Sequence, residues 1–261
     1  MSALVPEEDN KQSIEAPLNS VEVPRTYTPL EKFYAELLGT IFLVFVGTGV
    51  AVFTGDLVAS CVGGSLVLTS LIYVLGRYSG AHFNPAVSIP MFILGNLTTV
   101  EFILYIAAQL LGSFIASIFV AICRKGKFDQ LAGNKISNYL LSIDNNNLLN
   151  NEPDFMCYFS AFFCEIIITF LLVLVVYSSG VKQNNFGNLT GIVVGLTLGV
   201  LFFTGANISG GSLNPARSIA PAILQAVTGN DTTPLKQLWI YVLGPIIGGI
   251  AGGFIGKFFG K

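Results

Sequence analysis

The sequence has little charge. Only 11% of its 261 residues are charged, whereas an average soluble domain carries roughly 25%. Hydrophobic residues make up 52% of the chain, and its mean hydropathy is +0.70. A soluble fold of this size buries part of such an apolar excess but lacks the charged residues to cover the rest. The composition therefore excludes a soluble enzyme and favours a membrane protein with several spanning helices.

Histidine is nearly absent, and paired cysteines are missing. His82 is the single histidine, and the four cysteines include no Cys-x-x-Cys pair. A zinc or haem site is therefore not expected, and we predict neither a metal nor another cofactor. The net charge is −2, and the chain lacks the block of basic residues that a nucleic-acid partner needs. The cysteines are expected to serve as small apolar residues in helices.

Residues 1–30 lack the apolar run of a secretory signal peptide. They are polar, carry an acidic cluster near the start and contain several prolines, so they cannot bury a core. We expect a disordered N-terminus on the cytosolic side, followed by one membrane domain over residues 31–261.

That domain contains six apolar stretches that are long enough, or nearly so, to cross a bilayer with some tilt. They are residues 33–54, 58–76, 100–123, 155–178, 188–204 and 238–259. The fifth stretch is the shortest. A polar loop at 124–154 separates a first half, about 31–125, from a second half, about 155–261. The predicted fold class is an all-α membrane protein.

Two shorter apolar segments, each opened by an Asn-Pro-Ala triplet, do not fit the spanning pattern. The triplets are Asn84-Pro85-Ala86 and Asn214-Pro215-Ala216. Proline suits the first position of a helix, where its missing N–H would have no partner, and asparagine is a good N-cap. We therefore predict two half-helices of about ten residues. Such broken helices are tolerated at membrane depth only where they are buried in protein or line a water-filled cavity.

The two halves repeat each other. The segments AELLGT around Glu36 and CEIIIT around Glu165 are separated by almost the same number of residues as the two triplets. The segments that begin at Tyr105 and Tyr241 also correspond. Each half then holds three spans and one half-helix. Because three is an odd number, the halves must have opposite orientations, as in an inverted repeat with its site near the midplane.

The segments SGAHFNPAVS at 79–88 and SGGSLNPARSIAPA at 209–222 resemble the two signature loops of the aquaporin, or major intrinsic protein, family. The resemblance implies six tilted helices, two half-helices that meet in mid-membrane, and a homotetramer in the lipid bilayer with one pore in each subunit. It also implies a passive water channel, not an enzyme, that excludes protons and ions. The physics supports this, because two half-helix dipoles whose positive ends face one point oppose a cation there.

The same resemblance assigns roles to particular residues. It implies that the amides of Asn84 and Asn214 donate hydrogen bonds to passing water. Arg217 is a charge inside an apolar stretch, which marks a functional candidate in a membrane protein, and the resemblance places it in the narrowest filter of the pore. His82 is similar to a histidine in the family's first signature loop, and we expect it to line or brace the inner pore.

The other filter positions follow by counting from the triplets, and they are Gly64, Phe202 and Gly211. Two glycines and one phenylalanine depart from the family's water-selective pattern, so this filter could be wider than one water molecule. Ser218 points the other way, because glycerol facilitators typically carry an aspartate directly after the filter arginine. Water is the favoured solute on balance.

Glu36 and Glu165 are charges inside predicted spans, which is costly unless donors surround them. The resemblance implies that they accept hydrogen bonds from the backbone of the two signature loops and so support the pore. A role as a proton relay is the alternative.

Three other functions stay open at this point. The chain could be an aquaglyceroporin that also passes glycerol, urea or hydrogen peroxide, a secondary transporter built on the same repeat, or a gated or closed member of the junction type. We expect an integral multi-pass protein of the plasma membrane or an internal vesicle membrane, with both termini in the cytosol. The numbers of lysines and arginines on the two sides differ too little to decide the orientation.

Overall fold

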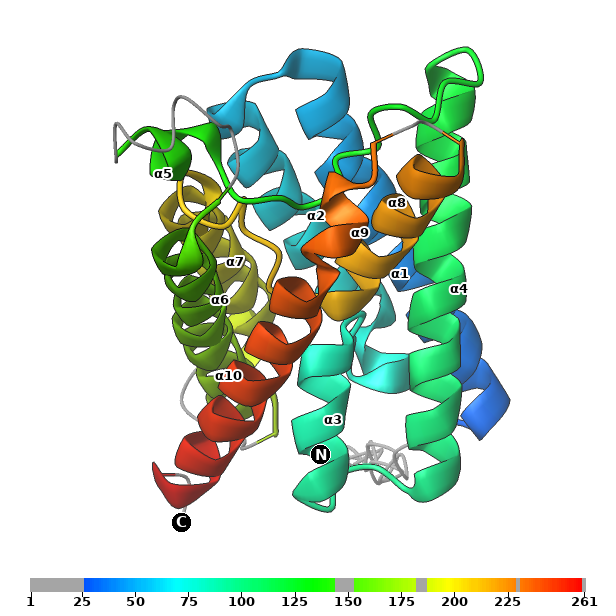
Figure 1. Cartoon of the computed structure of the whole chain (residues 1–261). Coiled ribbons are helices and arrows are strands. Elements are labelled where there is room, and N and C mark those ends of the chain that lie inside the picture. Colours follow the sequence, from blue (N-terminus) through cyan, green and yellow to red (C-terminus); the bar gives the residue numbers. More distant parts are fainter. Residues whose placement is uncertain (1–25, 144–152, 182–186, 229–230, 260–261) are drawn as a thin grey trace, which may run out of the picture.

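The regular elements of the described chain are helices (Figure 1). The structure is a computed structural model that describes residues 26–143, 153–181, 187–228 and 231–259. Most of the predicted disordered N-terminus and part of the loop at 124–154 lie outside the described residues. The long helices are α1 (Pro29–Thr54), α2 (Leu57–Ser79), α4 (Thr99–Cys123), α6 (Phe155–Val176), α7 (Thr190–Ala206) and α10 (Leu238–Phe259). The short helices are α3 (Pro85–Ile93), α5 (Asn138–Ser142), α8 (Pro215–Thr228) and α9 (Thr233–Lys236).

Five of the long helices have the length and hydropathy of membrane spans, and the sixth is short. Helices α1, α2, α4, α6 with its π-helical extension, and α10 have 22 to 26 residues. Helix α7 has 17 residues, which is the lower end of the range of about 17–25 that crosses a bilayer. The six predicted stretches are therefore confirmed to within a few residues, and the fifth is the shortest, as expected.

Local sequence determines where these helices begin and end. Thr28 before α1 and Thr98 before α4 each form a capping box with the glutamate three residues later, Glu31 and Glu101. In each box the threonine hydroxyl accepts from the backbone N–H of the glutamate, and the glutamate carboxylate accepts from the backbone N–H of the threonine. Each box thus provides acceptors for two backbone N–H groups at a helix start. Helix α2 ends at Gly80, whose φ of +84° is a left-handed cap that glycine adopts without strain. This cap turns the chain back toward the first half-helix.

The two half-helices run in opposite directions from the middle of the molecule (Figure 1). Helix α3 has 9 residues and α8 has 14, and the two helices touch. Each begins at the proline of its triplet, as predicted. Helix α8 is longer than the ten residues expected, and it continues past Pro221 to Thr228.

The helices pack in the same pattern in both halves. Helix α1 packs against α4 and α2, and its counterpart α6 packs against α10 and α7. Each half-helix packs against the last long helix of the other half, so α3 contacts α10 and α8 contacts α4. Helices α2 and α7 join the halves directly. This exchange of partners is the two-fold symmetry that an inverted repeat requires.

Glycines allow the closest contacts between these helices. A side chain at Gly248 of α10 would place its Cβ 2.1 Å from the backbone oxygen of Ile166, and one at Gly252 would place it 2.3 Å from the oxygen of Phe170. Both oxygens belong to α6. The small-xxx-small spacing therefore brings the two backbones together, as such patterns do in membrane helices.

Replacing Gly248 by alanine is expected to destabilise the fold by about 1–3 kcal/mol, because the methyl group meets a backbone oxygen that cannot rotate away. Gly47→Ala in α1 is the matched control, since a Cβ there meets nothing within 4 Å. Both variants replace glycine by alanine, which is a better helix former, so the difference in stability between the two variants reports the contact at Gly248. Thermal unfolding of the purified protein in detergent would measure it, and equal stabilities would contradict the packing described.

Candidate functional site

A cavity of about 300 Å³ lies between helices of both halves. The residues that sequence analysis singled out as pore-lining share its wall, and they are Asn84, Asn214, His82, Gly64, Phe202, Gly211 and Arg217. Much of the rest of the wall is apolar, with side chains such as Leu68, Val194 and Leu198. The structure thus brings these residues, which come from distant parts of the chain, to one elongated space.

The two asparagines tie the half-helices together. The Asn84 Nδ2 amide donates to the carbonyl of Leu213 at 2.8 Å, and the Asn214 Nδ2 amide donates to the carbonyl of Phe83 at 2.9 Å. Each Oδ1 accepts from the backbone N–H of the alanine in its own triplet. Asn84 and Asn214 therefore cap their own helices and also reach the loop of the other half. The prolines and alanines of the triplets are buried beside them.

Glu36 is completely buried and holds the first loop. Its Oε1 accepts from the Ser79 hydroxyl at 2.7 Å and from the His82 N–H at 2.9 Å. Its Oε2 accepts from the Phe83 N–H at 2.7 Å and from the Gln109 Nε2 at 2.8 Å. Four donors thus surround one carboxylate, which is the condition under which a charge is tolerated inside a membrane protein.

Glu165 holds the second loop in the same way. Its Oε1 accepts from the Ser209 hydroxyl at 2.7 Å and from the Ser212 N–H at 2.8 Å, and its Oε2 accepts from the Leu213 N–H at 2.9 Å. Ser209, Ser212 and Leu213 occupy the positions of Ser79, His82 and Phe83 in the repeat. Both glutamates contact the loops that the resemblance names, and neither lines the cavity.

These bonds sustain an unusual backbone. Ala81, Phe83 and Leu213 have φ values of +54°, +49° and +56°, a left-handed region that residues with a side chain rarely occupy. Gly211, the counterpart of Ala81, has a φ of +59°. The left-handed residues turn the N–H groups on each side of the loop toward the glutamate. The carboxylate therefore compensates for strain that the loops could not hold alone.

Two tyrosine hydroxyls form hydrogen bonds at the start of the two loops, and these contacts were not predicted from the sequence. The Tyr105 hydroxyl donates to the carbonyl of Ser79, and the Tyr241 hydroxyl donates to the carbonyl of Ser209, both at 2.7 Å. Tyr105 and Tyr241 begin the matching segments of the repeat. That correspondence was a signal of equivalent position, but it did not show which atoms the tyrosines contact.

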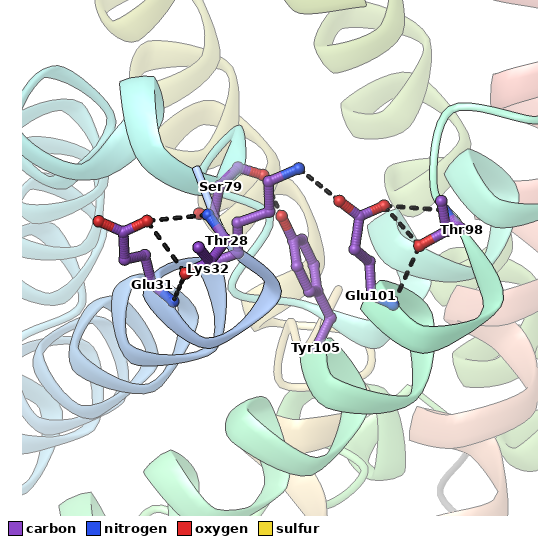
Figure 2. A network of polar contacts seen from close by, with 7 residues as sticks. All are labelled: Thr28, Glu31, Lys32, Ser79, Thr98, Glu101 and Tyr105. Carbon is purple, nitrogen blue, oxygen red and sulfur yellow. Dashed lines mark hydrogen bonds and ion pairs between the residues drawn. The ribbon is translucent and has the colours of Figure 1, made fainter. Parts of the chain in front are cut away.

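A polar network joins α1, α4 and the last residue of α2 near the end of the bundle where α1 begins (Figure 2). The Lys32 ammonium forms an ion pair with Glu101, and this pair links the capping boxes of the two helices. Tyr105 lies one turn beyond Glu101 and reaches Ser79. The residues of this network are Thr28, Glu31, Lys32, Ser79, Thr98, Glu101 and Tyr105. The network therefore anchors one end of the first loop.

The four predicted filter positions lie on the wall of the same cavity, and Phe202 lies close to both glycines. A Cβ at Gly64 would lie 2.8 Å from Cε2 of Phe202, and one at Gly211 would lie 3.5 Å from its Cδ1. The Phe202 ring therefore occupies the space that a side chain at Gly64 would take, and it lies within ordinary contact distance of a Cβ at Gly211. Arg217 supplies the polar component, and its Nη1 donates to the carbonyl of Ala132 at 2.6 Å.

His82 lies between this cavity and a further one of about 370 Å³ on the side where α1 begins. Its Nδ1 lies 3.0 Å from the Ser88 hydroxyl, and its ring meets Tyr105 edge to face with 5.2 Å between centroids. The histidine thus lines the cavity and is held by Ser88 and Tyr105.

Comparison with known proteins agrees with this architecture. A family model described as "Major intrinsic protein" matches residues 24–256. The chain is 36% identical over 221 residues to a glycerol uptake facilitator protein-like 6 of Lactiplantibacillus plantarum, covering 83% of this chain and 92% of that one. It is 37% identical over 225 residues to a probable aquaporin NIP-type of Nicotiana alata, covering 84% of this chain and 73% of that one.

A solved structure shares the fold. The chain superposes on the aquaglyceroporin from Plasmodium falciparum with a TM-score of 0.70 at 24% identity, over 90% of this chain and 96% of that one. The family model and the two relatives show that the chain is an integral multi-pass membrane channel and not an enzyme. It belongs to the major intrinsic protein family.

Replacing Glu36 by glutamine turns one of its two acceptor oxygens into an NH₂ group. Two of the four donors then face another donor, at a cost of about 1–3 kcal/mol for each group that is left unsatisfied. We expect a smaller yield of folded protein and a large loss of water permeability in proteoliposomes. Glu31→Gln in the same helix is the control, because glutamine also completes a capping box. If Glu36→Gln has the same yield and the same water permeability as the parent, the carboxylate does not hold the loop.

Proposed function

We propose that the protein is a passive channel that conducts water and also admits small uncharged polyols of glycerol size, while it excludes ions and protons. The observation that carries the proposal is the pair of glycines, Gly64 and Gly211, at the filter. They leave Phe202 as the one large side chain opposite Arg217 among the four positions. The relatives compared above include both a probable aquaporin and a protein named for glycerol uptake.

The asparagines orient the solute. A side-chain amide nitrogen carries two hydrogens, and at Asn84 and Asn214 one of them binds a backbone carbonyl. The other can donate to the oxygen of a passing water in the cavity that both residues line. The N-termini of α3 and α8 add their positive dipole ends at the same point. A water crossing this point presents its oxygen to the donors, and a cation meets a barrier.

The filter selects by size and by polarity. The Ala132 carbonyl binds only part of the five N–H donors of the Arg217 guanidinium. The remaining donors can bind solute oxygens, and the positive charge of the guanidinium repels cations. The Phe202 ring gives the wall of the same cavity an apolar surface. A polyol suits both sides, since its hydroxyl groups meet the arginine and its C–H edge meets the ring.

The assembly and orientation follow the family resemblance. We propose a homotetramer with both termini in the cytosol, in the plasma membrane or an internal vesicle membrane. Large apolar side chains on the outer faces of the long helices support contact with lipid or with neighbouring subunits, for example Leu66 and Val74 on α2 and Phe163 on α6. The start of α1 and the end of α10 lie at the same end of the bundle (Figure 1).

Replacing Phe202 by alanine is expected to raise the ratio of glycerol to water permeability several-fold, because the ring is the largest group at the constriction. Phe203→Ala is the matched control, since its side chain is exposed on the outer face. Stopped-flow light scattering of proteoliposomes gives both permeabilities. An unchanged ratio in Phe202→Ala would place the filter elsewhere.

Replacing Arg217 by alanine removes the charge from the filter. We expect proton or cation leakage that the parent lacks, measured with a pH-sensitive dye inside the vesicles, together with a wider range of admitted solutes. Arg217→Lys keeps the charge and should retain most of the ion exclusion. If Arg217→Ala has the same solute profile as the parent, the arginine does not form the filter.

A further inference from the structure

We propose that Asn134, in the segment between α4 and α5, is a positioning residue that sets the aperture of the filter. The inference rests on the proposed role of Arg217 as a filter residue. Asn134 lies outside the two signature loops and outside the four filter positions, yet its side chain joins the chain on both sides of the filter.

The segment that carries Asn134 is folded onto the second half-helix. Gln225 of α8 is buried, and its side-chain amide contacts this segment with both of its ends. Its Oε1 accepts from the Gly133 N–H at 2.8 Å, and its Nε2 donates to the carbonyl of Asp129 at 3.2 Å. At the start of the segment the Arg124 guanidinium donates to Asp129 at 2.8 Å, a bond that lowers the pKa of this carboxyl. The segment is therefore held in one place over the cavity.

Asn134 connects the two sides of the filter through its amide. The side chain is buried, with a residue exposure of 4%. Its Nδ2 donates to the carbonyl of Gly210 at 3.2 Å, and its Oδ1 accepts from the Ser218 hydroxyl at 2.8 Å. Gly210 directly precedes the filter residue Gly211, and Ser218 directly follows Arg217. One side chain thus bridges these two parts of the proposed filter, beside the contact of 2.5 Å between the Ser212 and Ser218 hydroxyls.

The same segment also holds the arginine itself. The carbonyl of Ala132, two residues before Asn134, accepts from Arg217 at 2.6 Å. Ala132 has a φ of +54°, so it is held in a strained conformation. The bonds of Gly133 and Asn134 on its C-terminal side supply the restraint. Loss of the Asn134 amide would therefore free the carbonyl on which Arg217 rests.

The repeat explains why an external segment performs this task. In the first half the hydroxyl of Ser88, the counterpart of Ser218, accepts from Gln109 Nε2 at 2.8 Å. Gln109 lies four residues after Tyr105 in α4, and the corresponding residue four after Tyr241 in α10 is Pro245. Proline has no side-chain amide, so α10 cannot bind Ser218 in this way. Asn134 supplies a side-chain amide from outside the bundle, although here the amide oxygen accepts from the serine hydroxyl instead of the amide nitrogen donating to it.

Asn134→Ala tests this role with a readout that general stability would not move. We expect water permeability to persist, while the ratio of glycerol to water permeability rises several-fold. We also expect phenylglyoxal to label Arg217 faster than in the parent, relative to Arg77 as an internal reference. Asn138→Ala is the matched control, because Asn138 is an exposed asparagine four residues further along the chain. It should behave as the parent in both measurements.

The inference is overturned if Asn134→Ala matches Asn138→Ala in permeability ratio and in labelling of Arg217. If Asn134→Ala does not fold, Asn134→Asp replaces it, since aspartate keeps the acceptor for Ser218 but removes the donor to Gly210. This variant should also change the labelling of Arg217, and parental labelling would again refute the role. A parent protein that passes neither water nor glycerol would refute the proposed function instead, and the labelling comparison would still test Asn134.

Discussion

Two carboxylates buried in an apolar bundle hold the loops on which the rest of the structure depends. Glu36 gathers four donors and Glu165 gathers three, and most of these donors belong to the loops before the half-helices. The loops contain left-handed residues that would not persist without such bonds. Because the loops end at Asn84 and Asn214, the carboxylates also determine where the half-helices start. The cavity, the donors that line it and the filter all follow from this placement.

The two halves share this design but complete it differently. In the first half the contacts to Ser88 come from Gln109 and His82, which belong to a spanning helix and to the loop itself. In the second half Ser212, the counterpart of His82, also contacts Ser218, but the other contact comes from an external segment, which also accepts a hydrogen bond from Arg217. The symmetric part of the fold therefore builds the pathway through the membrane. The asymmetric part is the one to which we assign the proposed adjustment of the filter.

Much of this arrangement could be predicted from the sequence, because it rests on local signals and on the repeat. Apolar runs indicated the spans, and the triplets indicated the half-helices with their asparagine caps. The roles of Tyr105, Gln109 and Asn134 could not be predicted in the same way. Their contacts join segments far apart in the chain, and Asn134 lies in a loop without periodicity. The length of α8 was also underestimated, since the apolar run that follows Asn214 is shorter than the helix.

Stopped-flow light scattering of proteoliposomes that hold the wild-type protein and a pH-sensitive dye tests the central claim most directly. A sucrose gradient should cause fast shrinkage, and a glycerol gradient should cause shrinkage followed by reswelling as glycerol enters. The internal pH should not relax faster than in empty vesicles. Fast proton entry, or fluxes that saturate and require an ion gradient, would contradict a passive channel whose half-helices and arginine exclude charge.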